Sequence, residues 1–121
     1  MHDRVWDLPL VTKEADVKIF LLILISRGYV WVVENMEEMK IVGIITEHDA
    51  LHLFENFSGN IRAEDVAKKD IIYCTKNEKV GEVIEKIKKY NVRRLPVVEE
   101  GKLIGEITLR LLIEKFYSLI P

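Results

Sequence analysis

Thr46 and Asp49 are the residues of this chain whose types and spacing best fit the binding of a ribose phosphate. Thr46 follows the apolar run 41–45, so its hydroxyl can cap a helix that begins at the next residue. The first N–H groups of such a helix attract an anion. Asp49 comes one turn later, where its carboxylate can accept hydrogen bonds from two neighbouring hydroxyl groups of a ribose.

The elements that would position these residues follow from apolar periodicity and capping residues. Asp16 is a suitable N-cap, and Gly28 a suitable C-terminal glycine, for a helix over 17–27. This helix is apolar on nearly all sides, which predicts that it contacts a partner surface as well as the protein's own core. The remaining elements expected in this half are strands over 29–33 and 41–45 and a helix over 47–57.

The second half of the chain repeats this order. Residues 75–80 parallel 12–17 at an offset of 63, and Thr108 matches Thr46 at an offset of 62. Each half therefore has the outline β-α-β-β-α, and two units this small are expected to pack together to bury their sheets. The elements expected in the second half are a helix from residue 80, strands over 95–98 and 103–107, a hairpin over 99–102 and a helix over 109–119.

The composition indicates a globular protein without a nucleic-acid or membrane surface. Of the 121 residues, 49% are hydrophobic and 31% charged, and the net charge of −2 gives no general attraction to a polyanion. The most apolar run, 19–25, is much shorter than the ~20 residues that a membrane helix needs. A single cysteine, Cys74, excludes a disulfide framework, so we expect a cytoplasmic protein.

The internal duplication, the segment 43–49 (Gly-Ile-Ile-Thr-Glu-His-Asp) and the segment 95–98 (Leu-Pro-Val-Val) resemble the CBS domain family. The resemblance spans almost the whole chain. It implies an α/β (α+β) fold of two β-α-β-β-α repeats packed with pseudo-two-fold symmetry, which together form a Bateman module. The expected boundaries are 1–57 for the first repeat, 58–62 for the linker and 63–121 for the second repeat.

In that family the segment 43–49 corresponds to a motif that binds AMP, ADP, ATP or S-adenosylmethionine, and Thr46 and Asp49 match its phosphate-side and ribose-side positions. The resemblance also implies that Arg93 and Arg94 hold phosphate, as a basic pair does in the γ subunit of AMP-activated protein kinase. Arg110 matches a further basic residue of that protein. A guanidinium suits phosphate because its planar fork is permanently charged. The apolar residues implied around the adenine are Ile44, Ile71, Ile72 and Pro96.

The two repeats differ at these positions. Leu111 stands where the second repeat should carry the ribose-binding carboxylate, and residues 28–31 of the first repeat include no cation at the places of the arginines. We therefore expect one adenine nucleotide in one inter-repeat cleft, between the carboxylate of one repeat and the cations of the other. The arginines favour phosphorylated ligands over S-adenosylmethionine, because its sulfonium is positive.

Simpler interpretations exist for the same residues. Asp49 can be an early-helix acid that the helix dipole stabilises. Arg93 and Arg94 can be solvated surface residues or ion-pair partners of Glu99 and Glu100, which would leave them little role in binding.

The function expected from this pattern is regulatory. The chain would sense a nucleotide, signal to a separate effector protein and form a homodimer, as paired modules of this family often do. The alternatives are a constitutive dimerisation or scaffold module with a vestigial pocket, and a sensor of S-adenosylmethionine. An enzyme is not expected, because no nucleophile–base pair emerges, and His48 and His52, although four residues apart, lack a third metal ligand. Nucleic-acid binding is not expected either, because basic and aromatic residues are not interleaved.

Overall fold

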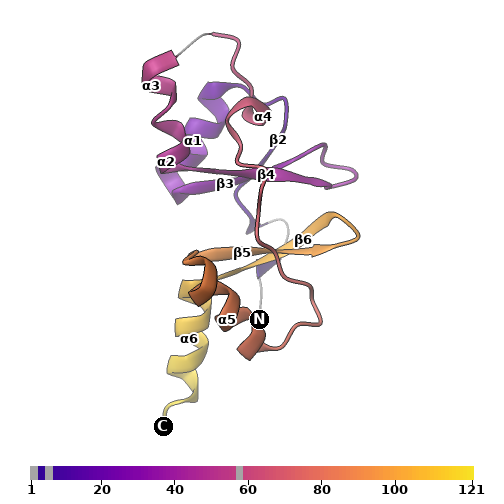
Figure 1. Ribbon diagram of the computed structural model, residues 1–121, viewed down its shortest axis with the longest axis vertical. Helices are drawn as coiled ribbons and strands as arrows, with labels where there is room; N and C mark the ends of the chain where they lie inside the picture. Colours follow the sequence, from indigo (N-terminus) through magenta and orange to yellow (C-terminus); the bar gives the residue numbers. More distant parts are fainter. Residues whose placement is uncertain (1–2, 5–6, 57–58) are drawn as a thin grey trace. The chain divides into compact units, whose positions relative to one another are not determined.

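The computed structural model describes residues 3–4, 7–56 and 59–121, and its contacts divide the chain into two compact units (Figure 1). One unit is Pro9–Ile71, and the other combines Met1–Leu8 with Ile72–Pro121. Both contain a helix followed by an antiparallel strand pair and a further helix, in the order that the sequence predicts. The predicted repeat boundaries stay a prediction, and Phe57 and Ser58, where the first repeat and the linker were expected to meet, lie outside the described residues.

The Pro9–Ile71 unit is a three-stranded sheet covered by a helix. Strand β2 (Leu10–Thr12) runs parallel to β3 (Tyr29–Val33), which pairs antiparallel with β4 (Ile41–Thr46), so the order is β2-β3-β4. Helix α1 (Val17–Arg27) connects the two parallel strands and packs on the sheet. The buried side chains of this core are those of Val11, Phe20, Leu24, Val30, Val32, Ile45, Leu53 and Ala63.

Helix α1 has the predicted bounds and the predicted caps. Asp16 Oδ1 accepts the N–H of Ile19 at 3.1 Å, and Gly28 ends the helix with a φ of 86°, a left-handed conformation that glycine adopts without strain. One side of α1 is buried in the core. The other side is exposed in the single chain, with Leu22 at 67% and Ile25 at 83% of full exposure, although the composition of the helix predicts that both sides are covered.

The predicted helix over 47–57 is wrong as one continuous element. The structure has α2 (Glu47–Ala50), a turn, and α3 (Leu53–Asn56), and the expected end at residue 57 lies outside the described residues. The N–H of Leu51 bonds to His48 O at 3.2 Å and the N–H of His52 bonds to Asp49 O at 3.4 Å. These i→i−3 bonds tighten the backbone where an α-helix would make i→i−4 bonds, so the helix ends after its first turn.

The sequence did not predict helix α4 (Ala63–Val66). Its first N–H groups bond to the segment between β2 and α1, Ala63 N to Ala15 O at 2.8 Å and Glu64 N to Lys13 O at 2.9 Å. The helix is therefore held by tertiary hydrogen bonds. Its own four residues contain no pattern that predicts them.

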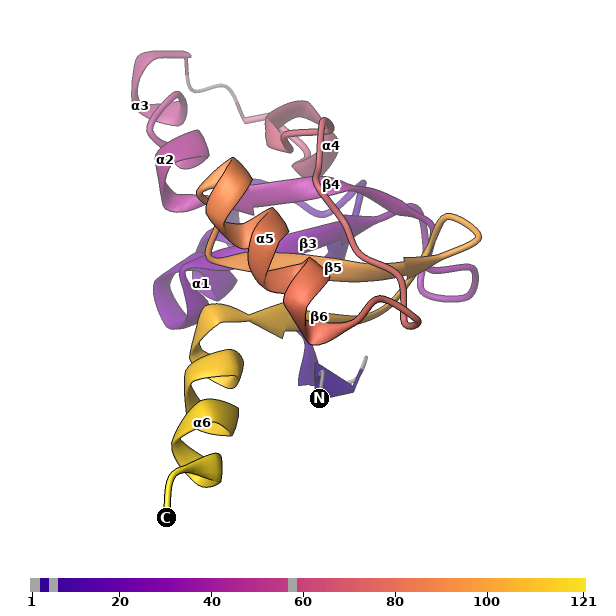
Figure 2. The same cartoon turned by 60° about the horizontal axis from the view of Figure 1, so that its bottom comes forward.

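The second unit contains α5 (Val80–Tyr90), β5 (Arg94–Glu99), β6 (Lys102–Thr108) and α6 (Leu109–Leu119). The two strands form the predicted hairpin, whose turn has positive φ angles at Glu100 (52°) and Gly101 (79°). Helix α5 covers one face of the hairpin (Figure 2). The core of this unit is made of Cys74, Val83, Ile87, Leu95, Val97 and Ile107.

Two further features complete this unit. A short strand β1 (Asp3–Arg4) pairs antiparallel with β6, so the sheet order is β1-β6-β5. The strand that should open the second repeat is reduced to a parallel bridge between Cys74 and Val97. Helix α6 leads away from the hairpin (Figure 1), and its outer residues are exposed, among them Phe116 at 67% and Tyr117 at 78%.

Candidate functional site

The candidate site begins at the end of β4, where Thr46 and Asp49 cap α2 reciprocally. Asp49 Oδ2 accepts two hydrogen bonds from Thr46, one from its backbone N–H at 2.9 Å and one from its hydroxyl at 2.8 Å. The Thr46 hydroxyl oxygen in turn accepts the N–H of Asp49 at 3.4 Å. This is a capping box closed by aspartate. Both residues are partly exposed, and no described residue donates a hydrogen bond to Asp49 Oδ1.

The backbone before Thr46 is fixed by a neighbouring segment. Ile44 donates its N–H to Lys68 O at 3.0 Å and accepts the N–H of Lys68 at 2.8 Å. Gly43 makes this approach possible, because a Cβ at that position would lie 2.3 Å from Lys68 O. The partly buried Ile44 side chain therefore stands at a defined place on β4, two residues before the cap.

The second repeat keeps only half of this arrangement. Thr108 Oγ1 accepts the N–H of Leu111 at 3.1 Å, but leucine has no carboxylate to return a bond to Thr108. A further difference escaped the sequence analysis: Glu106, at the position that Ile44 holds in the first repeat, is fully buried in β6. The offset of 62 residues already contains this substitution, although only the structure reveals its burial.

The three arginines of the sequence prediction lie in the second unit and differ in their contacts. Arg93 is exposed, and its carbonyl oxygen accepts the N–H of Leu109 at 2.8 Å, which fixes its backbone beside the start of α6. Arg94 is half-buried on β5 opposite Thr108. Arg110 Nε donates to Glu114 Oε1 at 3.2 Å, in an i, i+4 pair whose arginine side chain is 88% exposed.

The sequence suggests that the arginines could pair with Glu99. In the structure the Glu99 carboxylate has another partner, because its Oε1 accepts the N–H of Lys76 at 3.0 Å. Of the apolar residues implied around an adenine, Pro96 is buried, whereas Ile71 and Ile72 are partly exposed. Ile72 packs against the core of the second unit.

The predicted residues are distributed over both units. Thr46, Asp49, Ile44 and Ile71 belong to Pro9–Ile71, and Ile72, Arg93, Arg94, Pro96 and Arg110 belong to the other unit. Within the first unit the structure brings Thr46 and Asp49 into direct contact. The assignment of the whole set to one ligand stays a prediction.

A pair of residues that the sequence analysis missed is Glu78 with Lys86. Lys86 Nζ lies 2.6 Å from Glu78 Oε1 and donates to Tyr73 O at 2.8 Å. The Lys86 side chain on α5 therefore holds the backbone segment that precedes this helix. Glu78 Oε1 also accepts the N–H of Thr75 at 3.2 Å. The one available signal was the eight-residue spacing of a glutamate and a lysine, which is too common to be informative.

Cys74 is buried beside this pair. Burial raises the pKa of its thiol from 9.0 to about 11, the Glu78 carboxylate adds to the rise, and the Lys86 ammonium opposes it. A thiol with so high a pKa is protonated at neutral pH and a poor nucleophile. Cys74 is therefore a packing residue of the second core.

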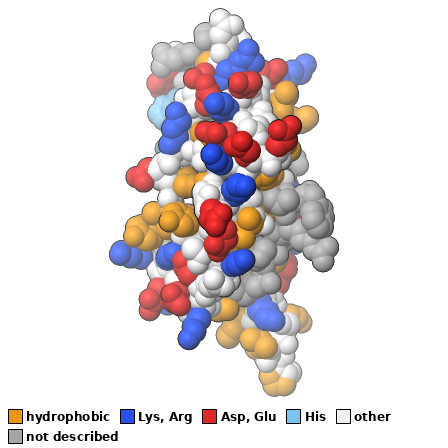
Figure 3. Space-filling view, turned by 90° about the vertical axis from the view of Figure 1, so that its right-hand side faces the viewer, with side chains coloured by type: hydrophobic (Ala, Val, Ile, Leu, Met, Phe, Trp, Pro, Cys, Tyr) orange, Lys and Arg blue, Asp and Glu red, His pale blue; other side chains and the backbone are white. Residues whose placement is uncertain are grey.

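The described part of the chain contains no group of three or more His, Cys, Asp or Glu side chains placed to hold a metal ion, so His48 and His52 belong to no such cluster there. Over the same residues, no helix combines the length and the hydropathy needed to cross a membrane. On the face shown in Figure 3, acidic and basic side chains are interspersed.

Comparison with known proteins shows the same duplication. The family model described as "CBS domain" matches twice, over residues 4–56 and 63–118. A crystal structure of CBSX2 in complex with AMP aligns with a TM-score of 0.84 over 98% of this chain and 93% of that chain, at 20% identity. The cytosolic domain of the Mg²⁺ channel MgtE in complex with ATP aligns with a TM-score of 0.72 over 90% and 45% of the two chains, at 21% identity. At these identities the likeness concerns the fold.

Curated relatives are longer proteins. Inosine-5′-monophosphate dehydrogenase of Staphylococcus epidermidis is 36% identical over 80 residues, which are 65% of this chain and 16% of that protein. The chain spans about a third or less of the length of the curated relatives it matches first, between 16% and 35%.

Proposed function

Because this chain belongs to the CBS domain family, we propose that it is a regulatory protein that senses an adenine nucleotide and has no catalytic activity of its own. The ligand class is AMP, ADP or ATP. Support for the proposal comes from the structural likeness to CBSX2, which was crystallised with AMP, and to the MgtE domain, which was crystallised with ATP. The observation that carries it is the geometry of Thr46 and Asp49 at the end of β4.

In this proposal Asp49 binds the ribose. Its Oδ2 is held by Thr46, which orients the carboxylate, and its Oδ1 accepts hydrogen bonds from the ribose hydroxyls. Thr46 lies on the phosphate side. The second repeat does not offer a ribose site of this kind, because Leu111 replaces the carboxylate and the buried Glu106 replaces Ile44. One nucleotide per chain is therefore proposed.

The cations proposed for the phosphate are Arg93, Arg94 and Arg110, and Arg93 is the strongest candidate of the three. It is exposed, and its backbone is fixed by the hydrogen bond to Leu109. Arg110 has to exchange its contact with Glu114 for the phosphate, which reduces the gain from binding. The adenine would lie among Ile44, Ile71, Ile72 and Pro96.

We propose a cytoplasmic homodimer as the acting form, with an effector protein that reads the nucleotide-bound state. Helix α1 and helix α6 each leave several large apolar side chains exposed, and this supports dimerisation, since exposed apolar patches mark protein contacts. The same observation favours the second candidate function, a constitutive dimerisation or scaffold module with a vestigial pocket. A sensor of S-adenosylmethionine is the remaining alternative.

Thermal unfolding of the chain with AMP, ADP, ATP or S-adenosylmethionine in millimolar excess tests these functions. A ligand that binds only the folded state raises the midpoint by mass action. We expect a rise with a nucleotide and a loss of about 2 kcal/mol, or roughly 30-fold in affinity, in Asp49→Ala. A rise only with S-adenosylmethionine would favour that sensor, and no rise with any ligand would favour the scaffold.

Asp65→Ala is the matched control for this experiment. Asp65 Oδ2 accepts the N–H of Arg62 at 2.9 Å, so it caps α4 as Asp49 caps α2, but it lies outside the nucleotide motif. Loss of this cap should lower the midpoint of the free protein and leave the nucleotide-dependent rise unchanged. An equal loss of binding in both variants would assign the effect of Asp49 to capping alone.

A further inference from the structure

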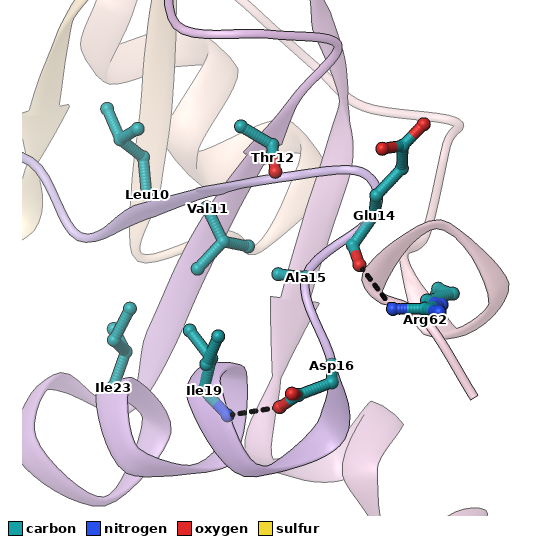
Figure 4. A pocket seen from close by; sticks show the side chains of 9 residues that line it. All are labelled: Leu10, Val11, Thr12, Glu14, Ala15, Asp16, Ile19, Ile23 and Arg62. Carbon is teal, nitrogen blue, oxygen red and sulfur yellow. Dashed lines mark hydrogen bonds between the residues drawn. The ribbon is translucent and has the colours of Figure 1, made fainter. Parts of the chain in front are cut away.

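A pocket of about 420 Å³ opens between β2 and α1 of the Pro9–Ile71 unit (Figure 4). Its lining residues do not include Thr46 or Asp49. Val11, Ile19 and Ile23 point toward one another from these two elements and form its apolar part. Asp16 and Arg62 stand at its rim. Arg62 Nη1 donates to Glu14 O at 3.1 Å, and the arginine remains exposed.

The internal repeat shows what fills this place in the other unit. At an offset of 63 residues, Ala15 corresponds to Glu78 and Ile23 corresponds to Lys86. There the ammonium of Lys86 donates to Tyr73 O, and the carboxylate of Glu78 accepts the N–H of Thr75. The ammonium and the carboxylate lie 2.6 Å apart. The second repeat thus satisfies two backbone groups with one positive and one negative group of its own.

The corresponding backbone groups of the first repeat belong to Leu10 and Thr12. In the parallel pairing with β3, Pro9 O accepts the N–H of Trp31 and Lys13 N donates to Val33 O. The backbone groups of Leu10 and Thr12 therefore face the free edge of the sheet. No described residue donates to Leu10 O or accepts from Thr12 N, and both residues line the pocket.

We propose that this pocket binds a small zwitterion with an apolar body, of the class of the aliphatic α-amino acids. The ammonium of the ligand would bond to Leu10 O, at the Ile23 end of the pocket, and the carboxylate would accept the N–H of Thr12 and bind Arg62. An α-amino acid carries both charges on one carbon, so it reproduces the close spacing of Lys86 and Glu78. Its side chain fits the wall made by Ile19 and Ile23.

The occupant is a small molecule because the free edge offers little to a peptide. Strand β2 has three residues, of which Leu10 and Thr12 present outward groups, whereas an added strand gains its affinity from a longer ladder. The apolar wall is also short, since its larger side chains between β2 and α1 are those of Val11, Ile19 and Ile23. This inference does not rest on the proposed nucleotide binding, because none of its residues belongs to that set.

The test is a titration of the full chain with L-leucine, followed by the backbone amide signals in two-dimensional NMR spectra. We expect saturable shifts that include Thr12 and Ala15. 4-Methylpentanoate, which lacks the ammonium, and 3-methylbutylamine, which lacks the carboxylate, should each bind at least about tenfold more weakly, because each loses one charge-assisted hydrogen bond. No shift at Thr12 with L-leucine, or equal binding of either analogue, would overturn the proposal.

The variant Ala15→Glu/Ile23→Lys builds the pair of the second repeat into the first, and it should abolish L-leucine binding while leaving the spectrum of the second unit unchanged. Ile19→Glu provides an independent variant at a half-exposed position, where the new carboxylate can reach solvent, and its folding is checked from its own NMR spectrum. This variant should lower the affinity for L-leucine by about tenfold or more, since it replaces an apolar side chain of the pocket wall with a charged one. Unchanged binding in the folded variants would overturn the assignment of this pocket.

Discussion

The hydroxyl of Thr46 and the Oδ2 of Asp49 lie 2.8 Å apart, and the same carboxylate oxygen accepts the backbone N–H of Thr46 at 2.9 Å. One carboxylate therefore has two roles in the proposed function. It holds the first turn of α2 with Oδ2, and it offers Oδ1 to a ligand. Any substitution of Asp49 changes the stability of the protein as well as its binding, so the two effects have to be measured separately.

Thr46 and Asp49 should be energetically coupled in the free protein. We expect Thr46→Val and Asp49→Ala each to lower the free energy of unfolding by about 1 kcal/mol. The double variant should lower it by less than the sum of the two single effects, because each single change already breaks the capping box. Urea unfolding of the four proteins gives the coupling. Thr108→Val with Leu111→Ala is the control cycle, since Thr108 receives no side-chain bond from Leu111. An additive result at Thr46 and Asp49 would contradict the reciprocal cap.

Arg93 should contribute more to nucleotide binding than Arg110. We expect Arg93→Ala to lower the affinity for AMP by about tenfold. Arg110→Ala should lower it by less, because Arg110 has to give up its ion pair with Glu114 to bind the phosphate. Glu114→Gln should tighten AMP binding if Arg110 takes part. Calorimetric titrations with AMP and with adenosine measure the difference, and the loss in Arg93→Ala should disappear for adenosine. An equal loss of affinity for AMP and for adenosine would show that Arg93 does not bind the phosphate.

Gly43→Ala should destabilise the first unit by about 1–3 kcal/mol, because the new Cβ would lie 2.3 Å from Lys68 O and force β4 away from the segment that holds Ile44. Gly81→Ala is the matched control. Nothing lies within 4 Å of a Cβ there, and the position is inside α5. Alanine should therefore raise the free energy of unfolding by about 0.5–1 kcal/mol. Chemical denaturation measures both changes. A Gly43→Ala variant as stable as the parent would show that the close approach does not constrain β4.

Cys74 should make stability fall in alkaline solution. Its thiol pKa is raised to about 11 in the folded protein, from 9.0, because burial and the Glu78 carboxylate disfavour the thiolate. The unfolded chain therefore loses this proton first, and the stabilisation present below pH 9 is lost as the pH rises toward 11. Cys74→Val, which copies Val11 of the first repeat, should flatten this part of the pH profile in urea unfolding. The same slope in both proteins would place the pH dependence elsewhere.

The proposed homodimer should depend on the apolar sides of α1 and α6. Leu22→Glu and Phe116→Glu should convert the dimer to a monomer in size-exclusion chromatography with light scattering, with little change in the fold, because both side chains are exposed in the single chain. The control is Met36→Glu, at an apolar residue between β3 and β4 that is 59% exposed, and it should leave the dimer intact. A parent protein that is already monomeric would contradict the proposal.

Much of the secondary structure was predictable because its signals are local. Asp16 and Gly28 bracket α1, and the turn at Glu100 and Gly101 joins β5 to β6, as expected. The contact of Thr46 with Asp49 was predictable for the same reason, since its partners are three positions apart in the sequence. The prediction of one continuous helix after Thr46 was wrong, because i→i−3 bonds end α2 after one turn; Phe54, an apolar residue within the predicted range, is 84% exposed, so the apolar pattern there does not reflect burial.

Taken alone, the sequence determined the duplication, the strands and helices with strong local signals, and the asymmetry between Asp49 and Leu111, because each depends on residue type and short spacing. The tertiary structure decided what depends on distant segments. It placed β1 beside β6, anchored α4 through Ala15 and Lys13, and set Lys68 against Gly43. It also revealed the open counterpart of the Glu78–Lys86 pair, because a pocket is defined by atoms that close around it in space.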